Sequence, residues 1–365
     1  MDFVKNTNKV WLFSHFYVPL QPGVQDSILM EKIKVLIVGA GPAGCTCGLL
    51  LKKRNVDCLL IDRAVFPRDK ICGGGLTPRS YRLLDRLLPS FHYDYNSVNR
   101  LKLLVEGKSV FDLHMDHELR IVKRREFDAQ LLEEYQKSGG RFANEALAAI
   151  EENDGQIVAT MQSGRQVACD YLVGADGANS RVRKHLNPLS DHGFLWMEQY
   201  GPKSPDNAIV INVSKTYEQG YYYSFPNESY DVQGFGDGQT TPQRFRQVLD
   251  AMGCPNLKPK GAFIPRSCDY PLHDHIILIG DAGGFPNRLT AEGLYYAFLT
   301  AKNAAEAISS GRPFAEVNSK VFAHKKREIW ESHFFYSKTG LALLRLLCNH
   351  FPGILKWCYN KATTP

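Results

Sequence analysis

The sequence predicts an α/β fold in which a parallel sheet wound with helices is joined to an antiparallel sheet. Near the N-terminus, apolar runs at 33–38 and 58–61 flank a glycine turn and an apolar helical stretch. Two later runs, at 169–176 and 275–281, each end in an aspartate. The intervening segments alternate apolar and polar residues in short runs, which is typical of antiparallel strands.

Length, charge and cysteine usage limit the classes of protein. The chain has 365 residues, enough for about two domains and a large core. Its net charge of +6 suits an anionic cofactor or membrane surface, but it is too diffuse to indicate nucleic acid as a partner. Nine cysteines without a CxxC pair predict reduced thiols in the cytoplasm and no metal site. No segment is apolar enough to span a bilayer, and we expect residues 1–29 to be a loose extension before Met30.

The segment Gly39-Ala-Gly-Pro-Ala-Gly44 has the spacing of a dinucleotide-binding turn. Gly39 permits the tight turn, Gly41 lets the backbone approach a pyrophosphate, and Gly44 lets the helix pack on the strand. The N-terminus of the helix then offers N–H groups and a positive dipole end to the phosphates. Asp62 follows the second strand, where it can accept hydrogen bonds from ribose hydroxyls. We find one copy of this motif, so one dinucleotide is held firmly.

The segment from 275 to 294 indicates which dinucleotide is bound. Asp281 ends an apolar run and could accept hydrogen bonds from a polyol chain. Thr290-Ala-Glu-Gly-Leu294 opens a helix that we expect to run to about Ser309 and to stop at Gly311. The start of this helix offers N–H groups to a carbonyl that acquires negative charge. A ribityl chain and a flavin ring need these two features, so the predicted dinucleotide is FAD.

On these motifs the sequence resembles the FAD-dependent geranylgeranyl reductases, within the wider fold of p-hydroxybenzoate hydroxylase-like flavoproteins. The resemblance covers about residues 31–310 and rests on the order of GAGPAG, KICGGGL, KRREFDAQLL, YLVGADGANSRVR and LIGDAGGFPNRLTAEGL. It implies an FAD-dependent oxidoreductase. The residues that it implies for cofactor binding are Gly39, Gly41, Ala43, Gly44, Asp62, Arg63, Cys72, Gly73, Gly75, Arg124, Leu147, Asp176, Asp281, Gly293 and Leu294.

The same resemblance implies a Rossmann-type FAD-binding domain, an antiparallel-sheet substrate domain and a C-terminal helical segment. The FAD-binding domain would be discontinuous. The expected boundaries are 1–29 for the extension, 30–79 with 119–189 and 263–315 for the FAD-binding domain, 80–118 with 190–262 for the substrate domain, and 316–365 for the C-terminal helices.

The loop Lys70-Ile-Cys-Gly-Gly-Gly75 contains three consecutive glycines, which cost backbone entropy unless something needs the room. In such a fold this loop passes beside the flavin ring, and glycines let the main chain lie flat against it. Cys72 is the candidate catalytic residue, as a proton donor close to the flavin. The alternative, that Cys72 packs as a small hydrophobic residue, stays open.

The segment Tyr221-Tyr-Tyr-Ser-Phe-Pro226 predicts an apolar wall for the substrate. Alternate residues of a strand share one face, so Tyr221, Tyr223 and Phe225 would line up. With Pro226 they resemble the substrate motif of the reductases, Tyr-x-Trp-x-Phe-Pro, except that Tyr223 replaces the Trp. A long isoprenoid chain needs such a lining. Aromatic residues of an ordinary sheet core would give the same pattern, so that alternative also stays open.

Three other positions depart from the family's pattern. Arg288 and Ala291 stand where the family usually has Pro and Gly, and Asp62 replaces the commoner Glu. The substitutions at 288 and 291 suggest one alternative function, a flavin-bearing lipid-binding protein with little turnover.

From Val321 onward the chain has a helical pattern, with basic residues among apolar ones. Such helices could lie in a membrane interface with their basic residues outward, which predicts a cytoplasmic protein that is peripheral at the membrane. They could equally cover the substrate domain and present a solvated basic face.

The predicted reaction is the reduction of carbon–carbon double bonds in a prenyl lipid of geranylgeranyl type, by hydride transfer from reduced FAD. NADPH, or a reduced ferredoxin or flavodoxin, would supply the electrons. The protein would supply an apolar lining, orientation and a proton. A second alternative is an NAD(P)H-dependent flavin monooxygenase acting on an aromatic or lipid substrate. A halogenase is disfavoured, because we find no Trp-x-Trp-x-x-Pro stretch.

Overall fold

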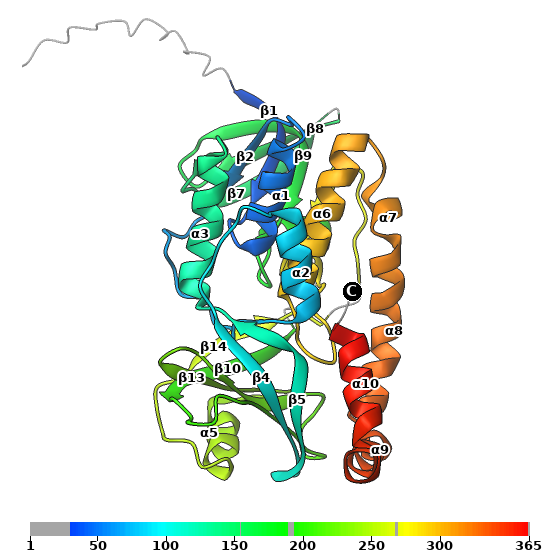
Figure 1. Ribbon diagram of the computed structural model, residues 1–365. Helices are drawn as coiled ribbons and strands as arrows, with labels where there is room; N and C mark the ends of the chain where they lie inside the picture. The colour runs from blue at the N-terminus through cyan, green and yellow to red at the C-terminus, as the bar shows by residue number, and fades with distance from the viewer. Residues whose placement is uncertain (1–29, 154, 189–192, 267–268, 364–365) are drawn as a thin grey trace, which may run out of the picture. The chain divides into compact units, whose positions relative to one another are not determined.

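A seven-stranded sheet forms the centre of one half of the fold (Figure 1). The computed structural model describes residues 30–153, 155–188, 193–266 and 269–363, and the part from Glu31 onward forms one compact unit. The predicted extension at residues 1–29 lies outside the described residues. The strands of this sheet are β1 (Glu31–Val38), β2 (Cys58–Ile61), β6 (Arg141–Ala143), β7 (Leu147–Asn153), β8 (Gln156–Met161), β9 (Gln166–Gly174) and β15 (Ile276–Leu278).

The strand order is β6-β2-β1-β9-β8-β7, with β15 beside β9. Strands β6, β2, β1, β9 and β15 pair in parallel, whereas β8 and β7 return as antiparallel strands. The helices α1 (Pro42–Lys52), α3 (Arg124–Lys137) and α6 (Leu294–Ser310) bury their apolar side chains in one core cluster with Val35, Ile37 and Leu60 of the sheet. On the other face, apolar side chains of the sheet, including those of β7 and β8, form a second cluster with Val182 of α4 (Arg181–Leu186). The predicted parallel, helix-covered sheet is confirmed.

A second sheet of eight strands has the order β14-β10-β13-β12-β11-β4-β5-β3. Its neighbouring strands are antiparallel, as predicted, except that β4 and β11 pair in parallel. The chain allows this exception, because parallel pairing needs a connection of about a dozen residues or more and about 100 residues separate the two strands. The strands are β3 (Gly75–Leu76), β4 (Asn96–Val105), β5 (Lys108–Ile121), β10 (Phe194–Pro202), β11 (Ile209–Val213), β12 (Tyr221–Pro226), β13 (Tyr230–Gly236) and β14 (Lys260–Ile264).

Two further helices come mainly from the segments expected to form the substrate domain. The helix α5 (Pro242–Ala251) covers one face of the second sheet with Phe245 and Leu249, which pack on Tyr222 and Phe235. The helix α2 (Pro78–Leu87) instead packs in the same core as α1 and α6. The two sheets consist of strands from different stretches of the chain. Because α2 packs in the core of the first sheet, the boundaries of the two expected domains stay a prediction.

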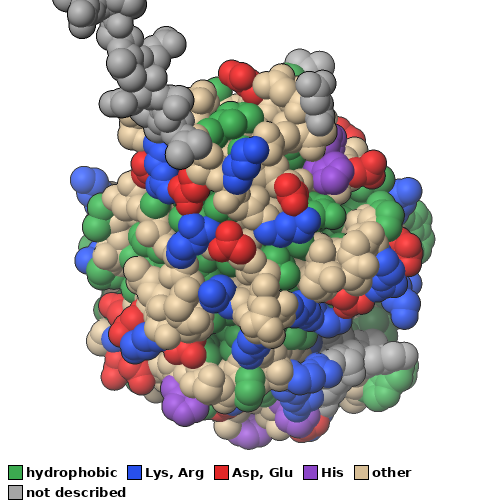
Figure 2. Space-filling model, turned by 90° about the horizontal axis from the view of Figure 1, so that it is seen from above, with side chains coloured by type: hydrophobic (Ala, Val, Ile, Leu, Met, Phe, Trp, Pro, Cys, Tyr) green, Lys and Arg blue, Asp and Glu red, His purple; other side chains and the backbone are tan. Residues whose placement is uncertain are grey.

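The C-terminal part of the chain is helical, as the sequence predicts. Helix α6 ends at Gly311, which has the positive φ of 69° that glycine adopts at little cost. The helices that follow are α7 (Phe314–Val317), α8 (Ser319–Phe335), α9 (Lys338–His350) and α10 (Pro352–Thr363). In the described ranges, no helix combines the length and the apolarity that crossing a bilayer would require. Figure 2 shows basic and acidic side chains interspersed over the face that is seen from above.

Candidate functional site

The turn between β1 and α1 is built so closely that side chains would not fit. Gly39 has a φ of 107°, and a Cβ on it would lie 2.3 Å from the carbonyl oxygen of Ala175. A Cβ on Gly44 would lie 1.8 Å from the carbonyl oxygen of Gly39. At Gly41 the nearest atom to such a Cβ is a guanidinium nitrogen of Arg68, at 3.5 Å. The first and third glycines therefore serve packing, and the second leaves an open approach to the backbone.

The N-terminus of α1 faces this opening without a side-chain cap. The first amide to bond back into the turn is that of Cys45, which donates to the carbonyl of Gly41 at 3.0 Å. The earlier amides at Ala43 and Gly44 are left for a ligand, because the first N–H groups of a helix have no partner within it. With the Arg68 guanidinium beside them, these groups fit a pyrophosphate. The site therefore fits FAD.

Asp62 lies directly behind the glycine turn, at the end of β2. Its two carboxylate oxygens accept hydrogen bonds from the amides of Ala40, at 2.7 Å, and Ala64, at 2.8 Å. The carboxylate is thereby fixed next to the turn, where the sequence predicts a ribose contact. The side chain of the neighbouring Arg63 is exposed.

A buried ion pair stands beside the turn. Asp128 is fully buried and receives a bidentate contact from Arg124, with N–O distances of 2.8 and 2.9 Å, and an ion pair from Arg68 at 3.3 Å. Burial lowers the pKa of Arg124, but the charge of Asp128 outweighs this and the pKa is raised overall. Sequence reasoning missed Arg68. The second cation of this loop, Lys70, lies 3.9 Å from a carboxylate oxygen of Asp281.

The glycines of the 72–75 loop pack against aromatic side chains of the second sheet. A Cβ on Gly73 would lie 2.6 Å from the Phe225 ring and 3.1 Å from the Tyr223 ring, and one on Gly75 would lie 3.0 Å from Phe225. Gly74 has a φ of 74°, and its Cβ would lie 2.1 Å from the carbonyl oxygen of Val122. The three glycines are thus required by close contacts within the protein itself.

Strand β12 presents the predicted aromatic row on one face. The ring centroids of Tyr221 and Tyr223 are 6.2 Å apart, and those of Tyr223 and Phe225 are 4.9 Å apart. Trp196 of β10 extends the row, with its centroid 4.9 Å from that of Tyr221. Tyr222 points to the opposite face and packs under α5. Pro226 ends the strand, and its carbonyl accepts a hydrogen bond from Asn96 at 2.7 Å.

A buried carboxylate, Glu198, connects this row to Cys72. Glu198 lies on β10 and is only 1% exposed. One oxygen accepts the Cys72 amide at 3.0 Å and the other accepts the Tyr223 hydroxyl at 3.0 Å. Burial raises the pKa of Glu198 more than these hydrogen bonds lower it. Sequence reasoning missed Glu198, although an acid in the middle of an otherwise apolar strand was a usable signal.

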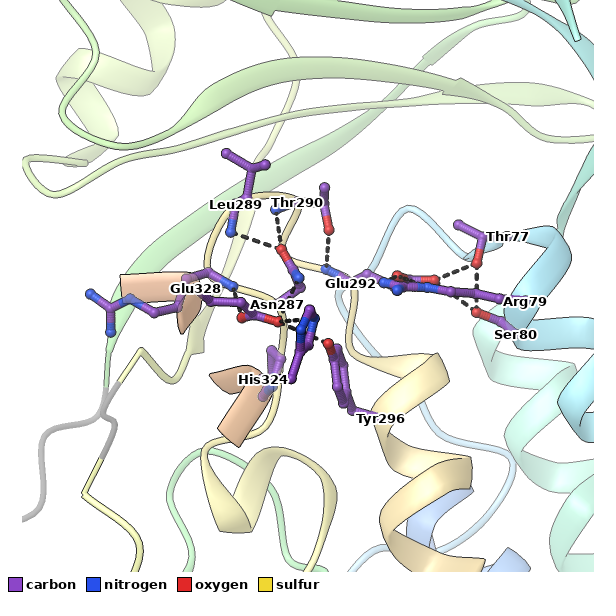
Figure 3. Close-up of polar contacts among 12 residues, drawn as sticks. Thr77, Arg79, Ser80, Asn287, Leu289, Thr290, Glu292, Tyr296, His324 and Glu328 are labelled. Carbon is purple, nitrogen blue, oxygen red and sulfur yellow. Dashed lines mark hydrogen bonds and ion pairs between the residues drawn. The ribbon is translucent and has the colours of Figure 1, made fainter. Parts of the chain in front are cut away.

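The 286–293 loop is held from both ends, as Figure 3 shows. Glu292 accepts hydrogen bonds from Thr77, Ser80 and Arg79 of the α2 start. At the other end Glu328 of α8 accepts the Asn287 side-chain amide at 2.8 Å and the Arg288 backbone amide at 3.0 Å. The buried Lys325 completes this cluster by pairing with Glu328. These contacts fix the loop that leads into Gly293 and Leu294 at the start of α6.

The structure shows what Arg288 and Ala291, the two residues of this loop that depart from the family's pattern, contact within the protein. A proline at 288 would have no N–H to donate to Glu328, whereas Arg288 has one. Ala291 has a φ of 54°, the left-handed region that glycine adopts most readily. Its methyl group packs against the aromatic cluster around Trp196 and Tyr223.

Two residues that the sequence predicts for cofactor binding, Asp176 and Leu147, make contacts within the protein itself. Asp176 follows β9 and accepts hydrogen bonds from the Ser180 hydroxyl and from the Arg181 amide at 2.7 Å, so it caps α4. Leu147 starts β7 and is buried in the core under the parallel sheet. The roles of the predicted site residues toward a cofactor stay predictions.

Comparison with known proteins agrees with this geometry. A family model described as an FAD binding domain matches residues 32–197. An uncharacterised protein of Methanosarcina barkeri is 30% identical over 309 residues, which are 78% of this chain and 76% of that protein. The menaquinone reductase of Mycobacterium tuberculosis and the geranylgeranyl diphosphate reductase of Rhodobacter capsulatus are each 27% identical, over 77% of this chain and 77% of their own.

Solved structures share the fold. A geranylgeranyl bacteriochlorophyll reductase-like protein from Thermoplasma acidophilum has a TM-score of 0.75 at 17% identity, over 88% of this chain and 92% of its own. The halogenase PltM has a TM-score of 0.69 at 18% identity, over 90% of this chain and 86% of its own. At these identities the likeness concerns the fold alone, which is that of FAD-binding proteins, as predicted.

We predict that Ala291→Gly stabilises the protein, because an alanine at this φ carries strain that glycine avoids. The expected gain in the free energy of unfolding is roughly 0.5–1 kcal/mol, by urea titration. Ala342→Gly is the matched control: it lies on an exposed helical position of α9 and should cost up to about 1 kcal/mol. Equal losses in both variants would contradict the assignment of strain to Ala291.

The raised pKa of Glu198 predicts a specific pH dependence of stability. A protonated Glu198 favours the folded state fully below its ordinary pKa of 4.5, and this contribution is lost as the pH rises through the raised folded-state value. The unfolding free energy of the wild type should therefore fall relative to that of Glu198→Gln as the pH rises above about 4.5.

A second variant gives this measurement an internal control. The hydrogen bond from Lys123 lowers the pKa of the exposed Glu228, so its contribution to the unfolding free energy is complete above the ordinary pKa of 4.5 and is lost only below it. The unfolding free energy of the wild type relative to that of Glu228→Gln should therefore stay constant as the pH rises above about 4.5. Parallel stability curves for the wild type and Glu198→Gln would show that Glu198 has no raised pKa.

Proposed function

Because this chain belongs to the FAD-dependent geranylgeranyl reductase family, we propose that it reduces carbon–carbon double bonds of a prenyl lipid. It is an FAD-dependent oxidoreductase. The observation that carries the finer proposal is the contact between the 72–75 loop and the aromatic row of β12, because it sets an apolar lining directly against the loop that we expect beside the flavin.

The cofactor would be held by the groups already described. The α1 amides and Arg68 would receive the pyrophosphate, Asp62 the adenosine ribose, and the start of α6 at Gly293 and Leu294 the pyrimidine edge. Bound FAD, once reduced, would supply the hydride. NADPH, or a reduced ferredoxin or flavodoxin, is the proposed source of its electrons.

The chain's own contribution would be an apolar binding surface and a proton. Tyr221, Tyr223 and Phe225 offer adjacent ring faces on which an isoprenoid chain can lie. An alkene has no polar group for the protein to bind, so its position depends on such contacts. The relatives named geranylgeranyl diphosphate reductase and menaquinone reductase are consistent with an apolar substrate of prenyl type.

The proton would come from the group formed by Cys72, Glu198 and Tyr223. The half-buried Cys72 thiol is the proposed donor, and the Glu198 carboxylate holds both the Cys72 main chain and the Tyr223 hydroxyl. Tyr223 replaces a Trp of the family motif, but both side chains carry a hydrogen-bond donor. The substitution can therefore preserve the contact to Glu198.

The first test is an anaerobic half-reaction. The flavin of the purified protein is reduced with dithionite, a geranylgeranyl lipid is added, and the flavin absorbance is followed. Reoxidation with a product heavier by two hydrogens is the expected result. A flavin that stays reduced until oxygen is admitted would argue for the monooxygenase, whereas tight lipid binding without reoxidation would argue for a lipid-binding protein.

The proton group can be tested with two conservative variants of neighbouring residues. Tyr223→Phe removes the hydroxyl that donates to Glu198 and should slow the half-reaction by about tenfold or more. Tyr222→Phe removes a hydroxyl on the opposite face of the same strand and should leave the rate unchanged. The rate is measured against pH, and a Tyr223→Phe profile that overlays the wild type would remove Tyr223 from proton delivery.

A further inference from the structure

The three C-terminal helices present large apolar side chains to the outside of the protein. Trp330 is 68% exposed and Phe351 is 51% exposed, and the rings of Trp330 and Phe334 stack on each other with centroids 5.7 Å apart. Figure 1 shows α8, α9 and α10 together along one side of the fold. We call this surface the outer helical face; its exposed apolar residues include Trp330, Phe334, Leu343, Leu346, Phe351 and Ile354.

The inner sides of these helices already have their partners. In α8, Val321 and Ser332 face the protein and are buried, whereas Trp330 lies about half a turn away. In α9 the buried residues are Leu341, Leu344 and Cys348, and Leu343 lies about 200° around the helix from Leu341. In α8 and in α9 the exposed apolar side chains therefore lie on the side of the helix opposite the buried one. A surface of this kind marks an interaction site.

The charge of the C-terminal helices indicates which kind of partner the outer helical face would bind. Residues 319–363, which form α8 to α10, contain eight Lys or Arg and two Glu. Glu328 is buried against Lys325, and Glu331 pairs with Arg327. Lys338 and Arg345 are exposed on α9 beside the apolar residues, and Lys326 is exposed beside Trp330 on α8. Two copies that met through this face would bring like charges together, which is unfavourable. An anionic surface with an apolar interior would satisfy both the charge and the apolar side chains.

The outer helical face also lies close to the proposed lipid site. The inner face of α9 shares one apolar cluster with Tyr221, the first ring of the aromatic row, and with Tyr336. A groove of about 370 Å³ lies at the junction of α8 and α9, lined by His333, Tyr336 and Ser337 on one side and by the 215–219 loop on the other. Helix α9 thus lies as a single layer between Tyr221 of β12 and the outside of the protein.

We propose that the outer helical face docks on a lipid bilayer with anionic head groups. The helices would lie in the plane of the interface, with Trp330, Leu343 and Leu346 in contact with the acyl region and the basic side chains at the head groups. This proposal concerns where the protein meets its substrate and does not depend on the reaction, because membrane binding is measured without turnover.

The test is sedimentation with vesicles of phosphatidylcholine alone or mixed with phosphatidylglycerol. The wild type should bind the anionic vesicles. The variant with Trp330→Ser, Leu343→Ser and Leu346→Ser should lose at least about tenfold in binding. Lys338→Gln and Arg345→Gln should each weaken binding about fivefold, and a higher salt concentration should also weaken it. The matched control is Val65→Ser with Leu257→Ser, because both residues are exposed apolar side chains on loops outside α8, α9 and α10, and it should bind like the wild type.

Three results would overturn the proposal. The wild type could fail to bind anionic vesicles, or the triple variant could bind them as well as the wild type does. Light scattering could show a dimer that the triple variant breaks, in which case the face is an interface between copies. Circular dichroism of the variants checks that the substitutions, all at exposed positions, leave the fold intact.

Discussion

The close contact between the 72–75 loop and strand β12 is the constraint on which the rest of the site depends. Because Gly73 lies against the rings of Tyr223 and Phe225, the loop that leaves the parallel-sheet half reaches the second sheet with no side chain between them. The same approach brings the Cys72 amide to Glu198, which would otherwise be a buried carboxylate with one partner fewer. An added methyl group at 73 would separate the two sheets where the chemistry is proposed to occur.

The loop before α6 is likewise held by contacts between residues that are distant in sequence. Glu292 joins it to α2, and Glu328 joins it to α8, so the proposed pyrimidine site is fixed by charges on two helices that are distant in sequence. Helix α8 has two functions in this account. Its inner face holds the loop through Glu328 and Lys325, and its outer face carries Trp330. A membrane contact through α8 would therefore act on an element that is directly bonded to the proposed flavin site.

The parts that could be predicted from the sequence are those that local chemistry determines. The turn at Gly39, the two flanking strands and the helix stop at Gly311 follow from spacing within a short window. The alternation of β12 likewise places Tyr222 on the face opposite its neighbours. The partners Arg68–Asp128, Glu198–Cys72 and Glu328–Arg288 could not be foreseen, because each joins residues that meet only after both sheets have formed. The parallel pairing of β4 and β11 was missed for the same reason.

The most direct measurement of the central claim is the mass of the product formed in air enriched in ¹⁸O₂. A geranylgeranyl lipid is incubated with the protein and an electron donor, and the lipid is analysed by mass spectrometry. We predict a product that is heavier by two hydrogens for each double bond reduced and that contains no ¹⁸O. A product that has gained one ¹⁸O atom would contradict the account and identify the protein as a monooxygenase on the same scaffold.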